Sequence, residues 1–148
     1  IIFGDTVDPE TVTQAIALPP SQATCKGQLD QVMPSGGVVR RSSPSPIGLW
    51  KHWLSDELQA LPLSEQLEHW AGIFAKHSTA LQDFKRQGAT VELNCCVIAN
   101  TAAIKIPAGL QALFGGLGVE LAITFYESNR PKYKRLRANS SLFTGKLG

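Results

Sequence analysis

The sequence has no apolar run approaching the roughly 20 residues that a membrane-spanning helix requires, so we predict no membrane span. Cysteine is scarce as well: the chain has three, and two of them, Cys95 and Cys96, are neighbours. On a strand their side chains point to opposite faces, which suits packing better than a disulfide. The alternative for Cys25, next to Lys26, is that its thiol is activated as a nucleophile, but the sequence indicates no histidine partner for it. These features predict reduced thiols and a cytoplasmic protein.

Motifs for catalysis, cofactor binding and metal binding are also missing. The sequence has no Cys-x-x-Cys pair, no Walker-type phosphate loop and no Gly-x-Ser-x-Gly nucleophile elbow. Its histidines lack metal-ligand spacing to one another and to the cysteines: His52, His69 and His77. A carboxylate-rich opening with Asp5, Asp8 and Glu10 is the alternative metal site. We expect no cofactor, no metal and no catalytic residues, which makes an enzyme the less favoured class.

No acidic residue follows Glu127, whereas six basic residues do. The other eight basic residues share the body of the chain with all 12 acidic ones, so the body carries a charge of about −4 and the tail about +6. A basic tail can bind nucleic acid or an anionic surface. Residues 129–148 have no amphipathic period, however, and we interpret them as a disordered end or a stretch foreign to the native protein. We expect no nucleic-acid partner apart from this tail.

The length of 148 residues and a hydrophobic content of 43% predict a single globular domain, which we place at residues 1–128. No signal peptide is visible. The chain begins at Ile1 rather than at Met, which suggests that a segment is missing in front and that the first strand is cut short.

The segment of residues 7–12 has the residue order of a helix N-terminus. Asp8 is a good cap for the free backbone amides, and Pro9 at the first helical position loses no hydrogen bond. Glu10 then lies near the positive end of the helix dipole. We predict a helix over residues 8–17, because the two prolines that begin at Pro19 cannot continue it.

The clearest helical period spans residues 63–84, where apolar and aromatic side chains recur at alternating spacings of four and three. They are Leu63, Leu67, Trp70, Phe74, His77, Leu81 and Phe84. Ser64 is a simple N-cap, and Gly88 is expected to end the helix in a left-handed conformation. The stripe is too wide to leave in water, so we predict one long helix packed on a sheet. A coiled coil is the alternative.

Several segments have features of strands. Residues 47–54 are β-branched and aromatic, and residues 90–98 and 119–126 alternate between apolar and polar side chains. The side chains predicted to point inward are Val91, Leu93, Cys95, Val97, Val119, Leu121, Ile123 and Phe125. A strand remnant at residues 1–3, a short extended stretch at 23–28 and a helix at 107–114 complete the elements. Residues 29–46, rich in Gly, Ser and Pro, read as a long hairpin connection or mobile loop.

These elements follow the order β-α-β-β-α-β, with a further α-β after it. The first six have the order of a ferredoxin-like fold. We therefore predict an α+β fold with its helices on one face of a mostly antiparallel sheet, which the last helix and strand extend.

Several short motifs follow one another along residues 2–127. They are Phe3-Gly4-Asp5 running into Asp8-Pro9-Glu10, then Lys26-Gly27, Gly48-Leu49-Trp50, the helix end at Gly88, and Leu117-Gly118-Val119-Glu120-Leu121. In this order and spacing the chain resembles the bacterial domain-of-unknown-function family four-two-seven-nine. That family has no assigned activity, so the resemblance implies no catalytic residues. The tail after Ser128 lies outside it.

Tryptophan and arginine gather in one part of the sequence. The candidate binding residues are Arg40, Arg41, Trp50, Lys51, His52 and Trp53. Along a strand Trp50 and His52 share one face, while Lys51 and Trp53 share the other. We expect one tryptophan in the core and the other exposed near the two arginines, because Trp and Arg dominate binding hot spots. The alternative is that both tryptophans are buried and the arginines only aid solubility.

Two classes of function fit these features. The first is a non-catalytic cytoplasmic protein-binding module, such as an immunity protein that neutralises a bacterial toxin, because inhibition needs a complementary surface and no chemistry. The second is a small-molecule-binding or enzymatic domain that uses a groove beside Trp50. A toxin gene directly upstream would favour the first class.

Overall fold

The computed structural model describes residues 1–32, 38–40, 42–98 and 104–126. The chain divides into two compact units, the first made of Ile1–Asn94 with Lys105–Ala122 and the second of Cys95–Ile104 with Ile123–Gly148. The predicted tail, residues 129–148, lies outside the described residues. All five helices of the described part belong to the first unit.

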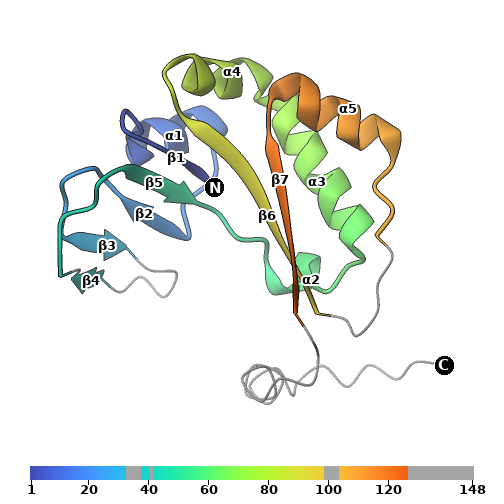
Figure 1. The fold of residues 1–148 in the computed structure, drawn as a ribbon, viewed down its shortest axis with the longest axis horizontal. Coiled ribbons are helices and arrows are strands. Elements are labelled where there is room, and N and C mark those ends of the chain that lie inside the picture. Colours follow the sequence, from blue (N-terminus) through green and yellow to red (C-terminus); the bar gives the residue numbers. More distant parts are fainter. Residues whose placement is uncertain (33–37, 41, 99–103, 127–148) are drawn as a thin grey trace. The chain divides into compact units, whose positions relative to one another are not determined.

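Seven strands form one sheet in the order β4-β3-β2-β5-β1-β6-β7 (Figure 1). They are β1 (Ile2–Gly4), β2 (Gln22–Thr24), β3 (Asp30–Val32), β4 (Val38–Arg40), β5 (Gly48–Lys51), β6 (Thr90–Ile98) and β7 (Glu120–Tyr126). Every adjacent pair from β4 through β6 is antiparallel. This confirms the predicted α+β class with a mostly antiparallel sheet, and β7 beside β6 extends the sheet as expected.

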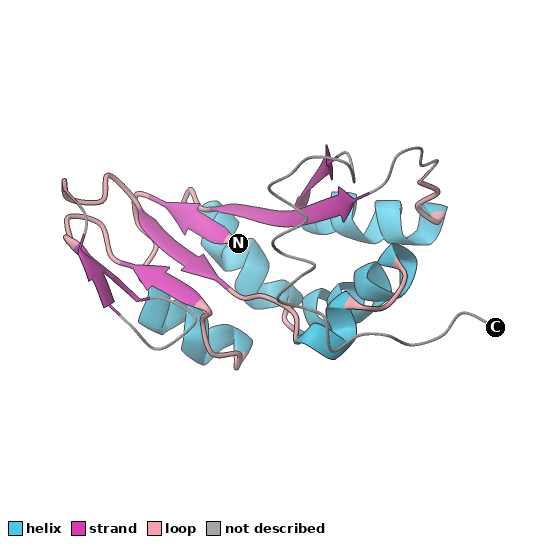
Figure 2. Cartoon of the chain, turned by 90° about the horizontal axis from the view of Figure 1, so that it is seen from below, coloured by secondary structure: helices cyan, strands magenta, loops and turns pink. Residues whose placement is uncertain are grey.

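One face of the sheet is apolar and packs against helices. Trp50 on β5 pairs with Ile2 on β1, and Ile2 pairs in turn with Val91 on β6. All three side chains are buried. The indole N–H of Trp50 donates to the Thr13 hydroxyl of α1 (Pro9–Ile16) at 3.1 Å, so this row faces that helix. Figure 2 shows the helices of the first unit on one side of its strands.

Helix α1 begins as the sequence predicts, with Asp8 at the N-cap and Pro9 at the first helical position. The Asp8 carboxylate accepts hydrogen bonds from the Thr11 backbone N–H at 3.1 Å and from the Thr11 hydroxyl at 2.7 Å. The helix ends at Ile16, and the C-cap Ala17 has a left-handed φ of 55°. Capping and the following prolines therefore set both ends of this helix.

The bonds from the Thr11 hydroxyl and then from the Thr11 backbone hold the pKa of Asp8 below its ordinary value. A lowered folded-state pKa means that the charged cap stabilises the fold above the unfolded-state pKa of about 4, and that this stabilisation is lost as the pH falls through the folded-state pKa. We expect Asp8→Ala to cost about 1 kcal/mol in urea unfolding at neutral pH and less below both pKa values. Asp8→Asn keeps the cap and serves as the uncharged control. An equal loss for Asp8→Ala at both pH values would contradict this role.

The predicted long helix is in fact two helices, α3 (Leu63–Lys76) and α4 (Ser78–Arg86), which meet at His77. At the junction φ is −109° and ψ is 23°, outside the helical range. A strict seven-residue repeat drifts by about 20° per heptad on a straight helix, so a break lets both halves face the core. The buried side chains are Leu67, Trp70, Ala71, Phe74, Leu81 and Phe84, whereas His77 is half-buried. The N-cap is Pro62, not the predicted Ser64.

Two segments differ from their predicted conformations. Residues 29–46 contain the short strands β3 and β4, where the sequence predicts a connection or mobile loop. After β5, residues 52–55 are irregular and α2 (Asp56–Gln59) follows, so the strand predicted to reach residue 54 ends at Lys51. Gly and Ser content lowers strand propensity, but pairing with neighbouring strands overrides it.

The last helix and strand also depart in detail. Helix α5 (Ala108–Leu117) runs through the two glycines expected to stop it and ends at Gly118, whose φ is 62°. In β7, Phe125 was predicted to point inward and is 54% exposed, while Leu121 and Ile123 are half-buried. Alternation along a strand determines which face of the sheet a side chain points to, but not whether another element covers that face. Within the described ranges, no helix combines the length and apolar content that a bilayer crossing requires.

Candidate functional site

The two tryptophans of the candidate surface lie in opposite environments. Trp50, on β5, is 3% exposed, whereas Trp53 is 49% exposed. Strand β5 ends before Trp53, yet the Trp53 backbone N–H donates to the Ser21 hydroxyl at 3.0 Å. The exposed tryptophan is therefore Trp53, and its backbone is tied to the segment that leads into β2.

His52 lies between the buried tryptophans. Its ring stacks on Trp50 with a centroid distance of 6.1 Å and meets the edge of Trp70 at 5.8 Å. Nδ1 of His52 lies 2.7 Å from the Pro19 carbonyl oxygen, and because a carbonyl only accepts, Nδ1 carries the proton. In the neutral ring Nε2 is then the acceptor, so the orientation and the tautomer of this histidine are both set by its neighbours.

The segment after Trp53 is braced by two glutamine side chains. Gln59 Nε2 donates to the Leu54 carbonyl at 2.6 Å. Gln66 Nε2, on α3, donates to the carbonyls of Gln59 at 3.0 Å and Leu61 at 2.7 Å. Leu61 is itself among the exposed large hydrophobic residues. These bonds hold residues 54–61 against α3, a feature without a recognisable sequence signal.

The structure does not bring the backbone of Arg40 beside Trp53. Arg40 ends β4, and β3 and β2 lie between β4 and β5, a separation of about 14 Å at the usual strand spacing. Nothing is described of the Arg40 side chain, and Arg41 lies outside the described residues. Lys51 is half-buried on the face of β5 opposite Trp50. The predicted surface therefore separates into distinct parts, and Trp53 is its exposed aromatic member.

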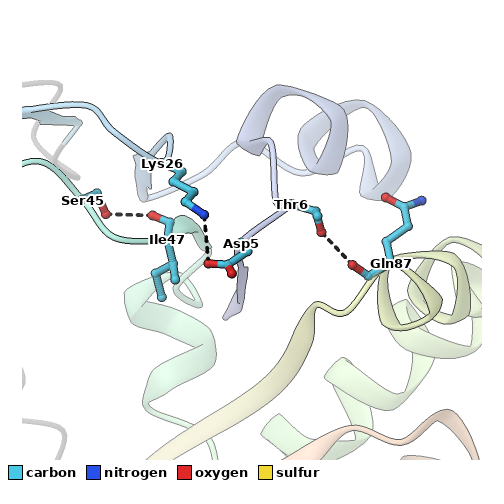
Figure 3. Close-up of polar contacts among 6 residues, drawn as sticks. All are labelled: Asp5, Thr6, Lys26, Ser45, Ile47 and Gln87. Atoms are coloured by element: carbon cyan, nitrogen blue, oxygen red, sulfur yellow. Dashed lines mark hydrogen bonds and ion pairs between the residues drawn. The ribbon is translucent and has the colours of Figure 1, made fainter.

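Figure 3 shows polar contacts of the loop between β1 and α1 and of a segment beside it. Asp5 forms an ion pair with Lys26 at 3.3 Å, and the Thr6 hydroxyl donates to the Gln87 carbonyl at 2.8 Å. On a neighbouring segment the Ser45 hydroxyl donates to the Ile47 carbonyl at 2.7 Å. The loop is thus anchored to two other segments, one at Lys26 and one at Gln87.

The carboxylates proposed as an alternative metal site each have a local partner. Asp5 pairs with Lys26, Asp8 caps α1, and Glu10 accepts a hydrogen bond from Gln14 Nε2 at 3.1 Å. Across the described residues no group of three His, Cys, Asp or Glu is placed to hold a metal ion. The arrangement is that of an anchored loop and a helix cap.

The cysteines are all unpaired, including the neighbours Cys95 and Cys96. Burial, and next the charge of Asp8, raise the pKa of the Cys25 thiol. A raised pKa lowers the thiolate fraction at neutral pH, which is the opposite of an activated nucleophile. Burial likewise raises the pKa of Cys95.

Comparisons with protein-family models, with curated proteins and with solved structures gave no match for this chain. The resemblance to family four-two-seven-nine therefore stays a prediction.

Proposed function

We propose that this chain is a non-catalytic protein-binding module that uses Trp53 as its main contact residue. The observation that carries the proposal is the 49% exposure of Trp53 together with the bond from its backbone to Ser21. A large exposed aromatic side chain on a fixed backbone loses little conformational entropy when a partner covers it. Tryptophan is also the residue type most enriched among binding hot spots.

The surroundings of Trp53 support a preformed surface. His52 precedes it and is held between two buried tryptophans, and the residues that follow are braced against α3 by Gln59 and Gln66. Preformed surfaces bind with less rearrangement than mobile loops. Leu61, also exposed, ends the braced segment and adds apolar area to the surface we propose.

The class of partner that we propose is a bacterial toxin, which would make the module an immunity protein in the cytoplasm. Two features support this. The body of the chain carries a charge of about −4, which favours a partner with a basic surface. Its three thiols are unpaired, which suits a reducing compartment.

We further infer a ferredoxin-like core within the sheet. The order β2-β5-β1-β6 supports this inference, because β5 lies between β1 and β2, which α1 connects, and β1 lies between β5 and β6, which α3 and α4 connect. The hairpin of β3 and β4 is then an insertion before β5.

Replacing Trp53 by alanine is expected to weaken binding to the partner about thirtyfold, the equivalent of about 2 kcal/mol. The partner is captured from a native lysate of the source organism, purified, and titrated by calorimetry against wild-type and variant chains. Phe125→Ala is the matched control, because Phe125 is an aromatic residue of similar exposure on another element. Thermal melts should show that both variants remain folded, since surface substitutions cost within about 0.5 kcal/mol.

Equal binding by folded Trp53→Ala and wild type would refute the proposed contact. A captured partner that arrests growth when expressed alone, and not when co-expressed with the chain, supports the immunity-protein class. A harmless partner would contradict that class and leave the binding surface standing. Turnover of a metabolite by the purified chain would overturn the non-catalytic proposal.

A further inference from the structure

The face of the sheet opposite the helices has its own regular composition. Leu49 on β5 pairs with Phe3 on β1, and Phe3 pairs with Thr90 on β6. This row alternates with the buried row of Trp50, so its side chains point away from the helices. All three are half-buried, and the helices of this unit lie on the other side of the strands (Figure 2). We call this surface the open face.

The next row of the open face carries a lysine and a glutamate on either side of the Ile1 terminal amine, whose pKa burial lowers to about 6. Lys51 follows Trp50, whose partner is Ile2, so Lys51 stands opposite Ile1. On the other side of Ile1 lies Glu92, whose backbone N–H donates to the Ile1 carbonyl at 2.8 Å. Lys51 and Glu92 therefore flank β1 at one level, separated by two strand spacings or about 10 Å.

Neither of these two half-buried charges has an ion-pair partner in the part of the chain that the structure describes. The ion pairs found there are Asp5 with Lys26 and Asp83 with Arg86. Glu92 accepts one hydrogen bond from Asn94 Nδ2 at 3.2 Å. A lysine and a glutamate held on opposite sides of a central strand make a surface that is complementary to its own copy.

We propose that the open face binds a second copy of this chain in a symmetric dimer. A two-fold axis parallel to β1 and lying between two facing sheets places β5 of one copy over β6 of the other. Lys51 of each copy then meets Glu92 of the other, and the two Phe3 side chains meet near the axis. Closely aligned strands are a common way for two sheets to pack, and a symmetric dimer repeats each contact twice.

The size of the open face predicts a weak dimer. Stable complexes bury about 800 Å² on each partner, and a face four strands wide and a few residues long provides less. We therefore expect a dissociation constant on the order of micromolar, which rises with salt because two ion pairs contribute.

Sedimentation velocity over a concentration series, with the full chain, tests the dimer. Wild type should pass from monomer to dimer as its concentration rises. Lys51→Glu and Glu92→Lys should each raise the dissociation constant about tenfold or more, because each places like charges in contact twice per dimer. The double variant carrying both substitutions should return to within about threefold of wild type, since it restores both pairs with reversed polarity.

Lys76→Glu is the control, because it changes the net charge by the same amount as Lys51→Glu, at an exposed position on α3. It should leave the dissociation constant unchanged. A wild type that stays monomeric throughout, a double variant as weak as the single ones, or an equal effect of Lys76→Glu would overturn the proposal. A dimer insensitive to Lys51 and Glu92 but lost in Val39→Lys would also overturn it, because the edge strand β4 would then be the interface. Trp53→Ala should not alter the dimer, which separates this test from that of the proposed function.

Discussion

Truncating Phe74 to alanine is expected to lower the free energy of unfolding by about 3–5 kcal/mol. Phe74 is 6% exposed on α3 and joins two other aromatic rings. Its ring centroid lies 5.5 Å from that of Trp70 and 6.1 Å from that of Phe114 on α5, with an edge-to-face angle of 77° to the latter. Removing the ring leaves a cavity where α3 and α5 pack, and no side chain nearby can fill it without leaving its own contacts.

Denaturant unfolding measures this loss, and Glu68→Ala on the same helix is the control because Glu68 is exposed. The control should change stability by less than about 0.5 kcal/mol. Near-ultraviolet circular dichroism should also change in Phe74→Ala, because its neighbour Trp70 stands against His52 in the same chain of rings. A loss below about 1 kcal/mol would rule out the packing of α3 against α5 at this residue.

Replacing Gly48 by alanine is expected to cost about 3 kcal/mol, at the upper end of the range for overpacked sites. A Cβ at this position would lie 1.8 Å from the carbonyl oxygen of Val7 and 2.8 Å from its carbonyl carbon. The clash is with backbone, so no rotamer change relieves it. The loop cannot move away easily either, because the residues on both sides of Val7 are anchored, Thr6 to the Gln87 carbonyl and Asp8 at the start of α1.

Gly72→Ala is the matched control for this substitution. Gly72 lies within α3 and a Cβ there would meet nothing within 4 Å. Alanine is the better helix former, so this variant should gain about 0.5–1 kcal/mol. The two Gly→Ala variants are thus expected to change the unfolding midpoint in opposite directions. Equal or inverted shifts would contradict the close approach of β5 to the β1–α1 loop.

The candidate site was predictable only in part. The sequence predicts that one of Trp50 and Trp53 is buried and the other exposed, since alternate residues of a strand face opposite sides. Which one is buried depends on the position of α1, where the Thr13 hydroxyl accepts a hydrogen bond from the Trp50 indole N–H. The sequence also could not place the two arginines relative to the tryptophans. They are close to Trp50 along the chain, yet β3 and β2 lie between β5 and β4, the strand that Arg40 ends.

Local chemistry by itself determined several features of this protein. The N-terminus of α1 follows from Asp8 and Pro9, because a cap and a missing N–H act over a single turn. The buried side of β6 follows from an apolar period of two, and the buried sides of α3 and α4 follow from apolar spacings that alternate between four and three. Both periods can be recognised without knowing which element packs against that side. Only the tertiary structure decided the break at His77, the pairing of β3 with β4 and the exposure of Phe125. Each of these depends on which neighbouring elements pair with or pack against the segment, and the free energy of such contacts exceeds the small propensities that a local pattern expresses.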